Sequence, residues 1–361
     1  MKVAEAIPEP AQAEAVFTGV LLGTAVGDAL GLPAENLPPG RIRRLWSGQW
    51  RMRFLFGNGM ISDDTEHTLM VAQTLLDHPQ DAAAFQRSLA WKLRWWFASL
   101  PAGVGLATAR ACIKLWLGFP LNQCAANSGG DGPAMRSAIL GAFFAGNVER
   151  RREFVRASSR LTHRGWQAET AALAIAEAVA LTTTGRKQPA ISQLIPILRE
   201  LSAEREWQDR VTQIESALTR GDSVVEFARS LGLDRGVSGY ALHAVPVALY
   251  AWWRHAADFR SALIAAIECG GDTDTVGAMV GALCGATGSA EAIPQEWLGH
   301  LRDWPRSVAF MRAVGKRMAD QTQSRHALSS VGYPWPGVIP RNLLFFLIVV
   351  IHGLRRLLPP Y

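Results

Sequence analysis

The stretch Gly270-Gly271-Asp272-Thr273-Asp274-Thr275-Val276-Gly277 opens an apolar run that is typical of a helix. Glycines recur in that run every four residues and therefore line one face of the predicted helix: Gly277, Gly281 and Gly285. A glycine inside a helix costs about 1 kcal/mol relative to alanine, so a row of them requires a physical reason. The reason available is space, because a face without side chains lets a second backbone approach closely.

A second glycine row lies near the start of the chain, in the apolar run 16–31. Its members are again spaced by four: Gly19, Gly23, Gly27 and Gly31. This spacing differs from the G-x-G-x-x-G of dinucleotide-binding proteins, and no strand precedes it. We predict that Gly277 and Gly281 face the helix that carries Gly23 and Gly27, or another close neighbour.

Carboxylates stand beside both glycine rows and at the start of a third apolar run. Asp272 and Asp274 begin the run described above, Ser62-Asp63-Asp64-Thr65 begins the run 69–76, and Glu35 follows the first glycine row. Asp, Ser and Thr are ordinary capping residues at a helix start, and the helix dipole also favours a carboxylate there. Capping and metal coordination both remain open, since one side chain can do both.

The combined set of acidic and hydroxyl side chains contains no His and no Cys: Glu35, Ser62, Asp63, Asp64, Asp272, Asp274 and Thr275. Oxygen ligands suit a hard cation such as magnesium, manganese or calcium and argue against zinc. If these stretches converge, their carboxylates repel one another unless cations neutralise them, and two cations match that charge better than one. Because two metals can hold a diol or phosphate and activate water, the residues suggest a dimetal hydrolase.

The composition is that of a globular protein. The 361 residues are 49% hydrophobic and 19% charged, and the net charge of +6 suits an anionic small ligand as well as a nucleic acid. No block of Lys and Arg with interleaved aromatic residues favours nucleic acid. The four cysteines lack CxxC spacing, which indicates reduced thiols, and the N-terminus lacks the basic start and apolar core of a signal peptide. We therefore expect a cytoplasmic protein.

The rest of the chain is typical of consecutive helices with short breaks, and it contains no convincing period-two strand. We expect a loose N-terminal tail over 1–13, one helical domain over 14–333, and a Pro-rich linker with an apolar helix over 334–361. An irregular surface loop is expected over 36–61. Three tryptophans are predicted to pack in the core: Trp91, Trp95 and Trp96.

The last segment contains an uninterrupted apolar run over 343–351, flanked by Arg341, Arg355 and Arg356. The run is shorter than the roughly 20 residues that cross a bilayer. A core helix, an oligomer contact and an interfacial anchor are all compatible with it. We favour burial against the domain or a partner subunit over contact with a membrane surface.

The stretch Asn127-Ser128-Gly129-Gly130-Asp131-Gly132-Pro133-Ala134-Met135-Arg136 combines a Gly-rich turn with a proline at the first position of a predicted helix. Free N–H groups at such a helix start can hold phosphate oxygens. The Lys-Ser/Thr of a nucleotide-triphosphate loop is missing, and a plain loop is the alternative. His163, in Thr162-His163, lies between two predicted helices, where a histidine is most often part of a polar surface.

In this order and spacing, these stretches resemble those of the ADP-ribosylglycohydrolases. The resemblance covers about residues 14–300 and includes Gly27-Asp28-Ala29-Leu30-Gly31 together with the four stretches described above. It implies an all-α, orthogonally packed multi-helix single domain with two magnesium or manganese ions in a central cleft. The implied reaction is hydrolysis of the glycosidic bond between ADP-ribose and an acceptor, which reverses ADP-ribosylation. An arginine on a protein is the acceptor that we favour, and an ADP-ribosylated small molecule is the other implied partner.

The resemblance also implies roles for individual residues. Those that match metal ligands are Ser62, Asp63, Asp64, Asp272, Asp274 and Thr275. Carboxylates with an implied part in catalysis are Glu35, Asp63 and Asp274. The positions implied to bind substrate are Glu35, Asn127, Ser128, Gly129, Gly130, Asp131, Gly132, Met135, His163 and Gly271.

One residue departs from the family pattern. Asp131 stands between two glycines where many relatives have Asn. A carboxylate near a diphosphate is unfavourable unless it faces the ribose or is paired, so Asp131 bears on the identity of the ligand. Two alternatives therefore stay open: a non-catalytic ADP-ribose-binding or structural protein on the same fold, and a dimetal hydrolase of another nucleotide or glycoside.

Overall fold

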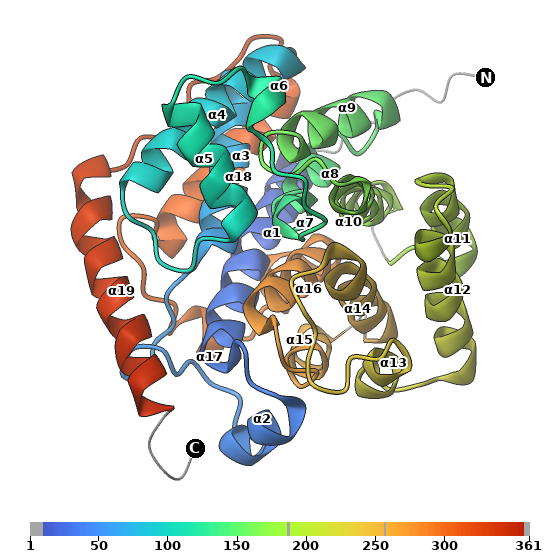
Figure 1. Cartoon of the computed structure of the whole chain (residues 1–361). Helices are drawn as coiled ribbons and strands as arrows, with labels where there is room; N and C mark the ends of the chain where they lie inside the picture. The colour runs from blue at the N-terminus through green and yellow to red at the C-terminus, as the bar shows by residue number, and fades with distance from the viewer. Residues whose placement is uncertain (1–9, 186–187, 256–257, 357–361) are drawn as a thin grey trace.

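The computed structural model describes residues 10–185, 188–255 and 258–356, and Figure 1 shows helices throughout. Within these residues, extended pairing is limited to isolated β-bridges, so the prediction of an all-α fold is confirmed. The helices are α1 (Pro10–Gly31), α2 (Pro39–Trp46), α3 (Asp63–Asp77), α4 (Ala82–Ala98), α5 (Leu106–Trp116), α6 (Leu121–Cys124), α7 (Gly132–Met135), α8 (Ala138–Phe143), α9 (Val148–Ser159), α10 (Trp166–Gly185), α11 (Ile191–Glu200), α12 (Arg205–Arg220), α13 (Val224–Ser230), α14 (Ala241–Arg254), α15 (Phe259–Ile267), α16 (Thr273–Gly288), α17 (Gln295–Leu298), α18 (Val308–Gln323) and α19 (Val338–Arg355).

Helices α1 and α16 form the centre of the fold, and α3, α10, α14, α15 and α18 pack around them (Figure 1). The two glycine rows meet face to face: Gly19 lies against Gly285, Gly23 against Gly281 and Gly27 against Gly277. A Cβ atom at any of these positions would overlap the backbone of the opposite helix. The prediction that Gly277 and Gly281 face the helix of Gly23 and Gly27 is confirmed.

The pairing of the glycines also sets the direction of the two helices. Because the last glycine of α1 faces the first turn of α16, the helices run antiparallel. At this end, Thr273 Oγ1 donates a hydrogen bond of 2.9 Å to the carbonyl oxygen of Gly31. The register brings the chain segment from Asp28 to Glu35 next to Asp272 and Asp274. The glycine rows therefore position the carboxylates as well as the core.

Several predicted boundaries differ from the structure. α1 begins at Pro10, so residues 10–13 belong to this helix and not to the predicted tail, while 1–9 lie outside the described residues. The predicted loop 36–61 contains α2, which buries Ile42 and Trp46. With eight residues, α2 is too short for a helical period to stand out. The division into 14–333 and 334–361 stays a prediction.

The tryptophans of α4 do not all lie in the core. Trp96 is buried as predicted, but Trp91 and Trp95 are 55% and 39% exposed. The prediction that these two belong to the core is wrong. Their spacing of four residues places them on one face of α4, and that face is turned toward solvent.

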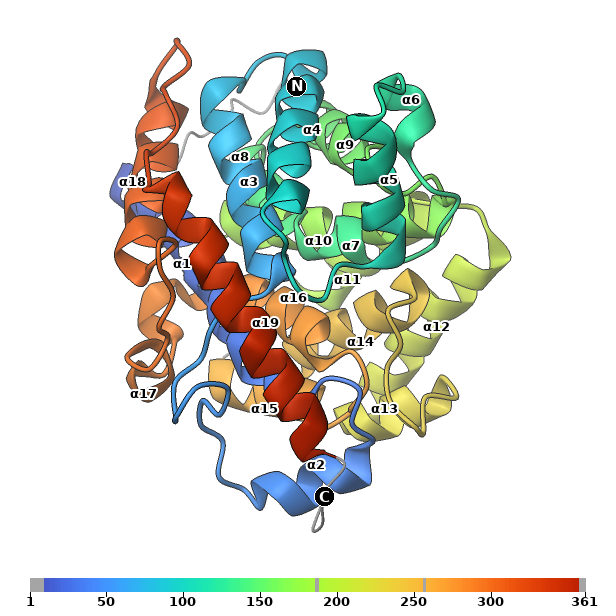
Figure 2. The ribbon, with the colours of Figure 1, turned by 60° about the vertical axis from the view of Figure 1, so that its left-hand side comes forward.

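Helix α19 lies across the outside of the domain (Figure 2). Polar contacts beneath it hold its inner face: Arg341 pairs with Asp303 at 2.6 Å and with Glu66 at 3.2 Å, and Asn342 Nδ2 donates to the carbonyl oxygen of Ser99 at 2.8 Å. A small apolar cluster also lies beneath the helix, made of Leu32, Phe54, Met60, Phe345 and Ile348. Because breaking a buried ion pair is costly, α19 is firmly attached to the domain.

By length and composition alone, two stretches of the described chain could cross a membrane, Pro10–Ala34 and Trp335–Arg355. The first contains the core helix α1, and 94% of its apolar stretch is buried. The second contains α19, and only 33% of its apolar stretch is buried. The expectation that the C-terminal segment is too short to span is therefore wrong on length, because the helix continues on both sides of the run 343–351.

Candidate functional site

The start of α3 is held in place by a buried carboxylate of α1. Asp28 Oδ2 accepts hydrogen bonds from the backbone N–H of Ser62 at 2.8 Å and from the N–H and hydroxyl of Thr65. Ser62 is the N-cap of α3, and its hydroxyl accepts from the N–H of Asp64. The capping interpretation is thus correct for Ser62. Asp28 fixes the segment from which Asp63 and Asp64 project, a role that the sequence did not reveal.

The start of α16 is shaped by two glycines in the left-handed region, Gly270 with φ +71° and Gly271 with φ +79°. Gly271 donates its N–H to the carbonyl oxygen of Leu37 at 2.9 Å and accepts from the N–H of Asn36 at 2.7 Å. Val237 lies on its other side, where a Cβ atom at Gly271 would overlap its backbone. Both polar groups of Gly271 are used within the chain. The structure therefore gives Gly271 a positional role, and its contact with substrate stays a prediction.

The two predicted halves of the site meet. Thr275 Oγ1 of α16 donates to Asp64 Oδ2 of α3 at 3.4 Å, and Ser62 Oγ donates to the same oxygen at 3.2 Å. Asp272 is the N-cap residue of α16, but its side chain accepts no capping hydrogen bond. The capping interpretation therefore does not account for Asp272.

Several carboxylate oxygens of this site are buried without a hydrogen-bond partner in the described part of the chain: Asp28 Oδ1, Asp64 Oδ1, Asp131 Oδ2 and Asp274 Oδ1. An unpaired buried oxygen of this kind is costly, and a buried carboxylate is normally paired or coordinates a metal. The site thus contains acceptors that the protein itself does not satisfy.

Burial and mutual repulsion raise the pKa values of the clustered carboxyl groups. Burial raises the pKa of Asp28 to about 6. The pKa of Asp64 is raised well above its usual value by burial, then by the charges of Asp28 and Asp63. For Asp274, burial and then Glu35 and Asp272 raise the pKa. These shifts mean that the site favours protons or cations over bare negative charge.

The residues fit a hard cation by chemistry, although they do not form a ready-made cage. Among the described residues, no three His, Cys, Asp or Glu side chains come together as a metal-ligand cluster. The side chains that do converge offer only oxygen atoms, including the unsatisfied ones of Asp64 and Asp274. Oxygen donors with excess negative charge are what magnesium and manganese prefer.

Glu35 lies between the site and the end of α19. It follows the short helix η1 (Leu32–Ala34), and its Oε1 accepts from Asn36 Nδ2 at 3.1 Å. Burial and then the charge of Asp272 raise the pKa of Glu35, while Arg356 partly offsets the shift. Arg356 donates to the carbonyl oxygens of Glu35 at 2.9 Å and Pro33 at 3.0 Å. The C-terminal helix therefore supports the segment that presents Glu35.

The glycine-rich loop is less open than its sequence indicates. The N–H of Gly130 donates to Ser128 Oγ at 3.2 Å, and the N–H of Asp131 donates to the carbonyl oxygen of Gly239 at 3.1 Å. These two amides are used within the chain and are not free for phosphate. Of the other predicted contacts in this stretch, Asn127 is exposed, Gly129 and Gly132 are partly exposed, and Met135 is buried.

Asp131 belongs to the carboxylate cluster. Its pKa is raised well above the usual value by burial, then by the charge of Asp272 and a hydrogen bond with it. The carboxylate of the glycine-rich loop therefore lies near the carboxylate at the start of α16, and their negative charges repel. The departure from the family pattern thus lies among the acidic side chains of the site.

His163 packs under the glycine-rich loop, where Cβ atoms at Gly130 and Gly132 would crowd its ring. Its Nδ1 lies 2.9 Å from Thr162 Oγ1. Burial and then the charge of Arg136 lower the pKa of His163 to about 3, so its ring is neutral at ordinary pH. Arg136 is fully buried and donates to Thr162 Oγ1 and to the carbonyl oxygens of Gly132 and Ser158. Arg136 therefore holds together the segments on this side of the site. In the sequence, only its position directly after Met135 indicated that it belongs to the site.

Buried carboxyl and hydroxyl groups lie together at the starts of two helices of an all-helical domain. This arrangement defines the class of protein, a helical domain with an acidic, hydrolase-like site. The model of the family described as ADP-ribosylglycohydrolase matches residues 9–327. The chain belongs to the ADP-ribosylglycohydrolase family. Membership indicates hydrolysis of ADP-ribosyl bonds. Helix α19 lies beyond the matched residues.

Two curated relatives and one solved structure illustrate the similarity. The chain is 28% identical to the ADP-ribosyl-dinitrogen reductase glycohydrolase of Rhodospirillum rubrum, over 78% of this chain and 89% of the relative. It is 26% identical to an ADP-ribosylarginine hydrolase of Pseudomonas putida, over 80% of this chain and 75% of the relative. A solved ADP-ribosylglycohydrolase-related protein complex has a TM-score of 0.62 and 26% identity, covering 86% of this chain and 99% of that one.

Proposed function

We propose that the protein hydrolyses the glycosidic bond between ADP-ribose and an arginine side chain, with two magnesium or manganese ions bound at the carboxylate site. The observation that carries the proposal is the meeting of α3 and α16, where Thr275 contacts Asp64 and buried carboxylate oxygens lack a partner. Arginine is favoured as acceptor because one relative of this chain is named as an ADP-ribosylarginine hydrolase. A cytoplasmic location is part of the proposal, supported by four buried free cysteines.

The residues proposed to hold the ions are Ser62, Asp63, Asp64, Asp272, Asp274 and Thr275. Bound ions would supply a Lewis acid for the ribose hydroxyls and a lower pKa for water. In the reaction, water adds to the anomeric carbon, the carbon–nitrogen bond breaks, and the guanidine leaves with a proton. Glu35, whose pKa is raised mainly by burial, is suited to hold or release that proton. Asp63 and Asp274 are the other carboxylates proposed to assist.

Purified protein with magnesium should release free ADP-ribose from an arginine-ADP-ribosylated peptide, and EDTA should stop the release. Substrates with ADP-ribose on serine or on a small molecule, run in parallel, identify the acceptor class. Binding of ADP-ribose without turnover of any of these would contradict the enzymatic proposal and favour the non-catalytic alternative. Turnover of another nucleotide or glycoside alone would favour the hydrolase alternative that Asp131 leaves open.

Magnesium should stabilise the protein more at about pH 7.5 than at about pH 5. The folded-state pKa values of Asp28, Asp64 and Asp274 are raised, so the folded protein binds protons more tightly than the unfolded chain. That stabilisation is fully present below the unfolded pKa and is lost as pH rises through the folded pKa, about 6 for Asp28. The metal-free melting temperature should therefore fall over this range, and magnesium should restore it by several degrees.

Thermal unfolding by circular dichroism, with EDTA or magnesium at each pH, measures this effect. Asp274→Asn serves as the matched variant, because it removes one repelling charge and one proposed ligand. Its magnesium-induced shift should be smaller than that of the wild-type protein. Equal magnesium shifts at both pH values, or none at either, would contradict the proposed metal site.

A further inference from the structure

The outer face of α19 is apolar along its whole length. Every exposed residue from 339 to 354 is hydrophobic, proline or glycine. Large side chains on this face are between 39% and 59% exposed: Leu343, Phe346, Leu347, Val350, Ile351 and Leu354. Isolated exposed apolar residues are ordinary, but a continuous apolar face of this kind marks a surface that contacts something other than water.

The helix is fixed in the plane of the protein surface. On its inner face, Arg341 lies 2.6 Å from Asp303 and Asn342 donates to Ser99, as described above. These buried polar contacts would have to break before α19 could stand across a bilayer. A helix whose inner face is held by the protein and whose outer face is apolar is suited to lie within a membrane interface.

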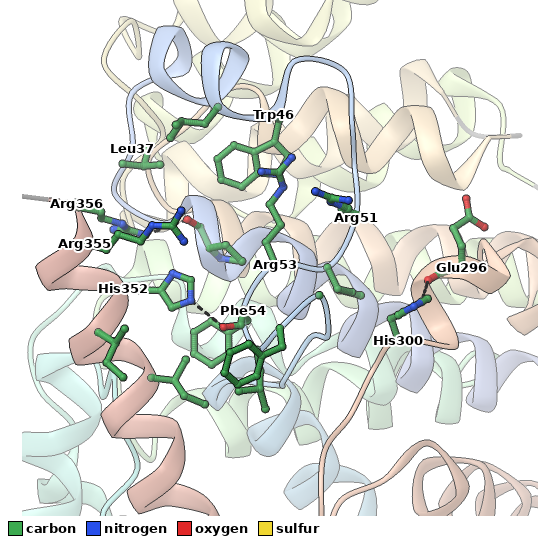
Figure 3. A pocket seen from close by; sticks show the side chains of 18 residues that line it. Leu37, Trp46, Arg51, Arg53, Phe54, Glu296, His300, His352, Arg355 and Arg356 are labelled. Atoms are coloured by element: carbon green, nitrogen blue, oxygen red, sulfur yellow. Dashed lines mark hydrogen bonds between the residues drawn. The ribbon is translucent and has the colours of Figure 1, made fainter. Parts of the chain in front are cut away.

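A basic pocket adjoins the C-terminal end of α19 (Figure 3). It has a volume of about 780 Å³, and the guanidinium groups of Arg51, Arg53, Arg355 and Arg356 line it together with apolar walls. Among the described residues that line it, Glu296 is the single acidic side chain, and it forms an ion pair with Arg260. Basic groups beside apolar walls complement an anionic headgroup attached to hydrocarbon.

Exposed tryptophans gather at the opposite end of α19. Trp335, directly before the helix, is 42% exposed, and its ring centroid lies 6.0 Å from that of Trp95. Trp95 also contacts Trp91 at 5.9 Å and Trp116 at 5.4 Å, and both of these are exposed. Tryptophan is enriched where a protein meets the headgroup region of a bilayer.

We propose that the outer face of α19 docks this protein onto an anionic phospholipid membrane, with headgroups at the Arg51–Arg356 pocket. Charge distinguishes this occupant from a second copy of the chain. Residues 321–361 contain no Asp or Glu, so a second α19 would offer no negative charge to the arginines of the first. An anionic bilayer supplies both the apolar interior and the opposite charge. Docking does not depend on the proposed reaction.

Flotation of the whole protein with vesicles tests the proposal. The protein should float with vesicles of equal parts phosphatidylcholine and phosphatidylglycerol, and much less with phosphatidylcholine alone. Leu347→Glu should lower the partition coefficient about tenfold or more, because it places a charge at the centre of the apolar face. Arg355→Gln should lower binding to the anionic vesicles about fivefold and leave binding to neutral vesicles unchanged.

Val148→Glu is the matched control. Val148 is 46% exposed at the start of α9, which lies away from α19 in Figures 1 and 2. It should bind vesicles like the wild-type protein, and all variants should keep the wild-type circular dichroism spectrum. Failure of the wild-type protein to bind anionic vesicles overturns the proposal, as does equal binding by Leu347→Glu. The wild-type protein could instead form a dimer in light scattering, become a monomer with Leu347→Glu, and bind no vesicles. That result would overturn the proposal and assign the outer face of α19 to contact with a second copy of the chain.

Discussion

Asp274→Asn should lower the rate of ADP-ribose release by a factor of about 1,000 or more, while the protein stays folded. Asp274 is buried at the start of α16, and its Oδ1 has no hydrogen-bond partner among the described residues. A neutral amide of the same shape keeps the packing but removes a negative charge that the proposed ions need. Because burial and neighbouring carboxylates disfavour this charge, the metal-free variant should be at least as stable as the metal-free wild type.

The measurement is single-turnover release of ADP-ribose, together with the melting temperature in EDTA. Asp258→Asn is the matched control, since Asp258 caps α15 and asparagine caps a helix equally well. This control should keep full activity. If Asp274→Asn also keeps full activity, Asp274 is an ordinary acidic residue at a helix start. It would then not be a metal ligand, which contradicts the proposed site.

Gly281→Val should prevent folding. A Cβ atom at Gly281 would overlap the carbonyl group of Gly23, and the clash would be with backbone, which cannot rotate away. Separating α1 from α16 would disturb the centre of the core at a cost on the order of 5 kcal/mol or more. Typical domains are stable by only about 5–15 kcal/mol, so we expect insoluble protein or loss of the cooperative unfolding transition.

Gly353→Ala provides the control for this substitution. Gly353 also lies inside a helix, α19, but nothing lies within 4 Å of a Cβ atom placed there. Alanine at that position should raise the free energy of unfolding by about 0.5–1 kcal/mol, because it restricts the unfolded chain. Denaturant unfolding of both variants measures the contrast. A soluble Gly281→Val protein with near wild-type stability would mean that the glycine rows are not required for packing.

The central helix pair could be predicted from the sequence because glycine spacing is a local property. A repeat of four residues places every member on one helix face, and a face without side chains has few uses other than close packing. The carboxylates beside the glycines could be recognised for the same reason, as Asp272 and Asp274 occupy a helix start. Neither inference required knowledge of where distant segments lie.

Contacts between distant segments could not be predicted in the same way. Nothing local to Asp28 indicates that it accepts three hydrogen bonds from Ser62 and Thr65. The amides of Gly271 look available in the sequence, but Leu37 and Asn36 use its polar groups in the fold. Such roles depend on which backbone groups meet after folding, and a single stretch of sequence does not contain that information.

The two apolar helices show the division most clearly. Sequence alone determined that α1 and α19 are both helical and rich in hydrophobic residues, because composition and period act within one segment. Only the tertiary structure decided that α1 is enclosed by α16 and α18 while the outer face of α19 stays uncovered. Burial depends on whether other elements are available to cover a face. The site follows the same division. The carboxylates could be recognised in single stretches of sequence, but only the packing of α3 against α16 brings them together.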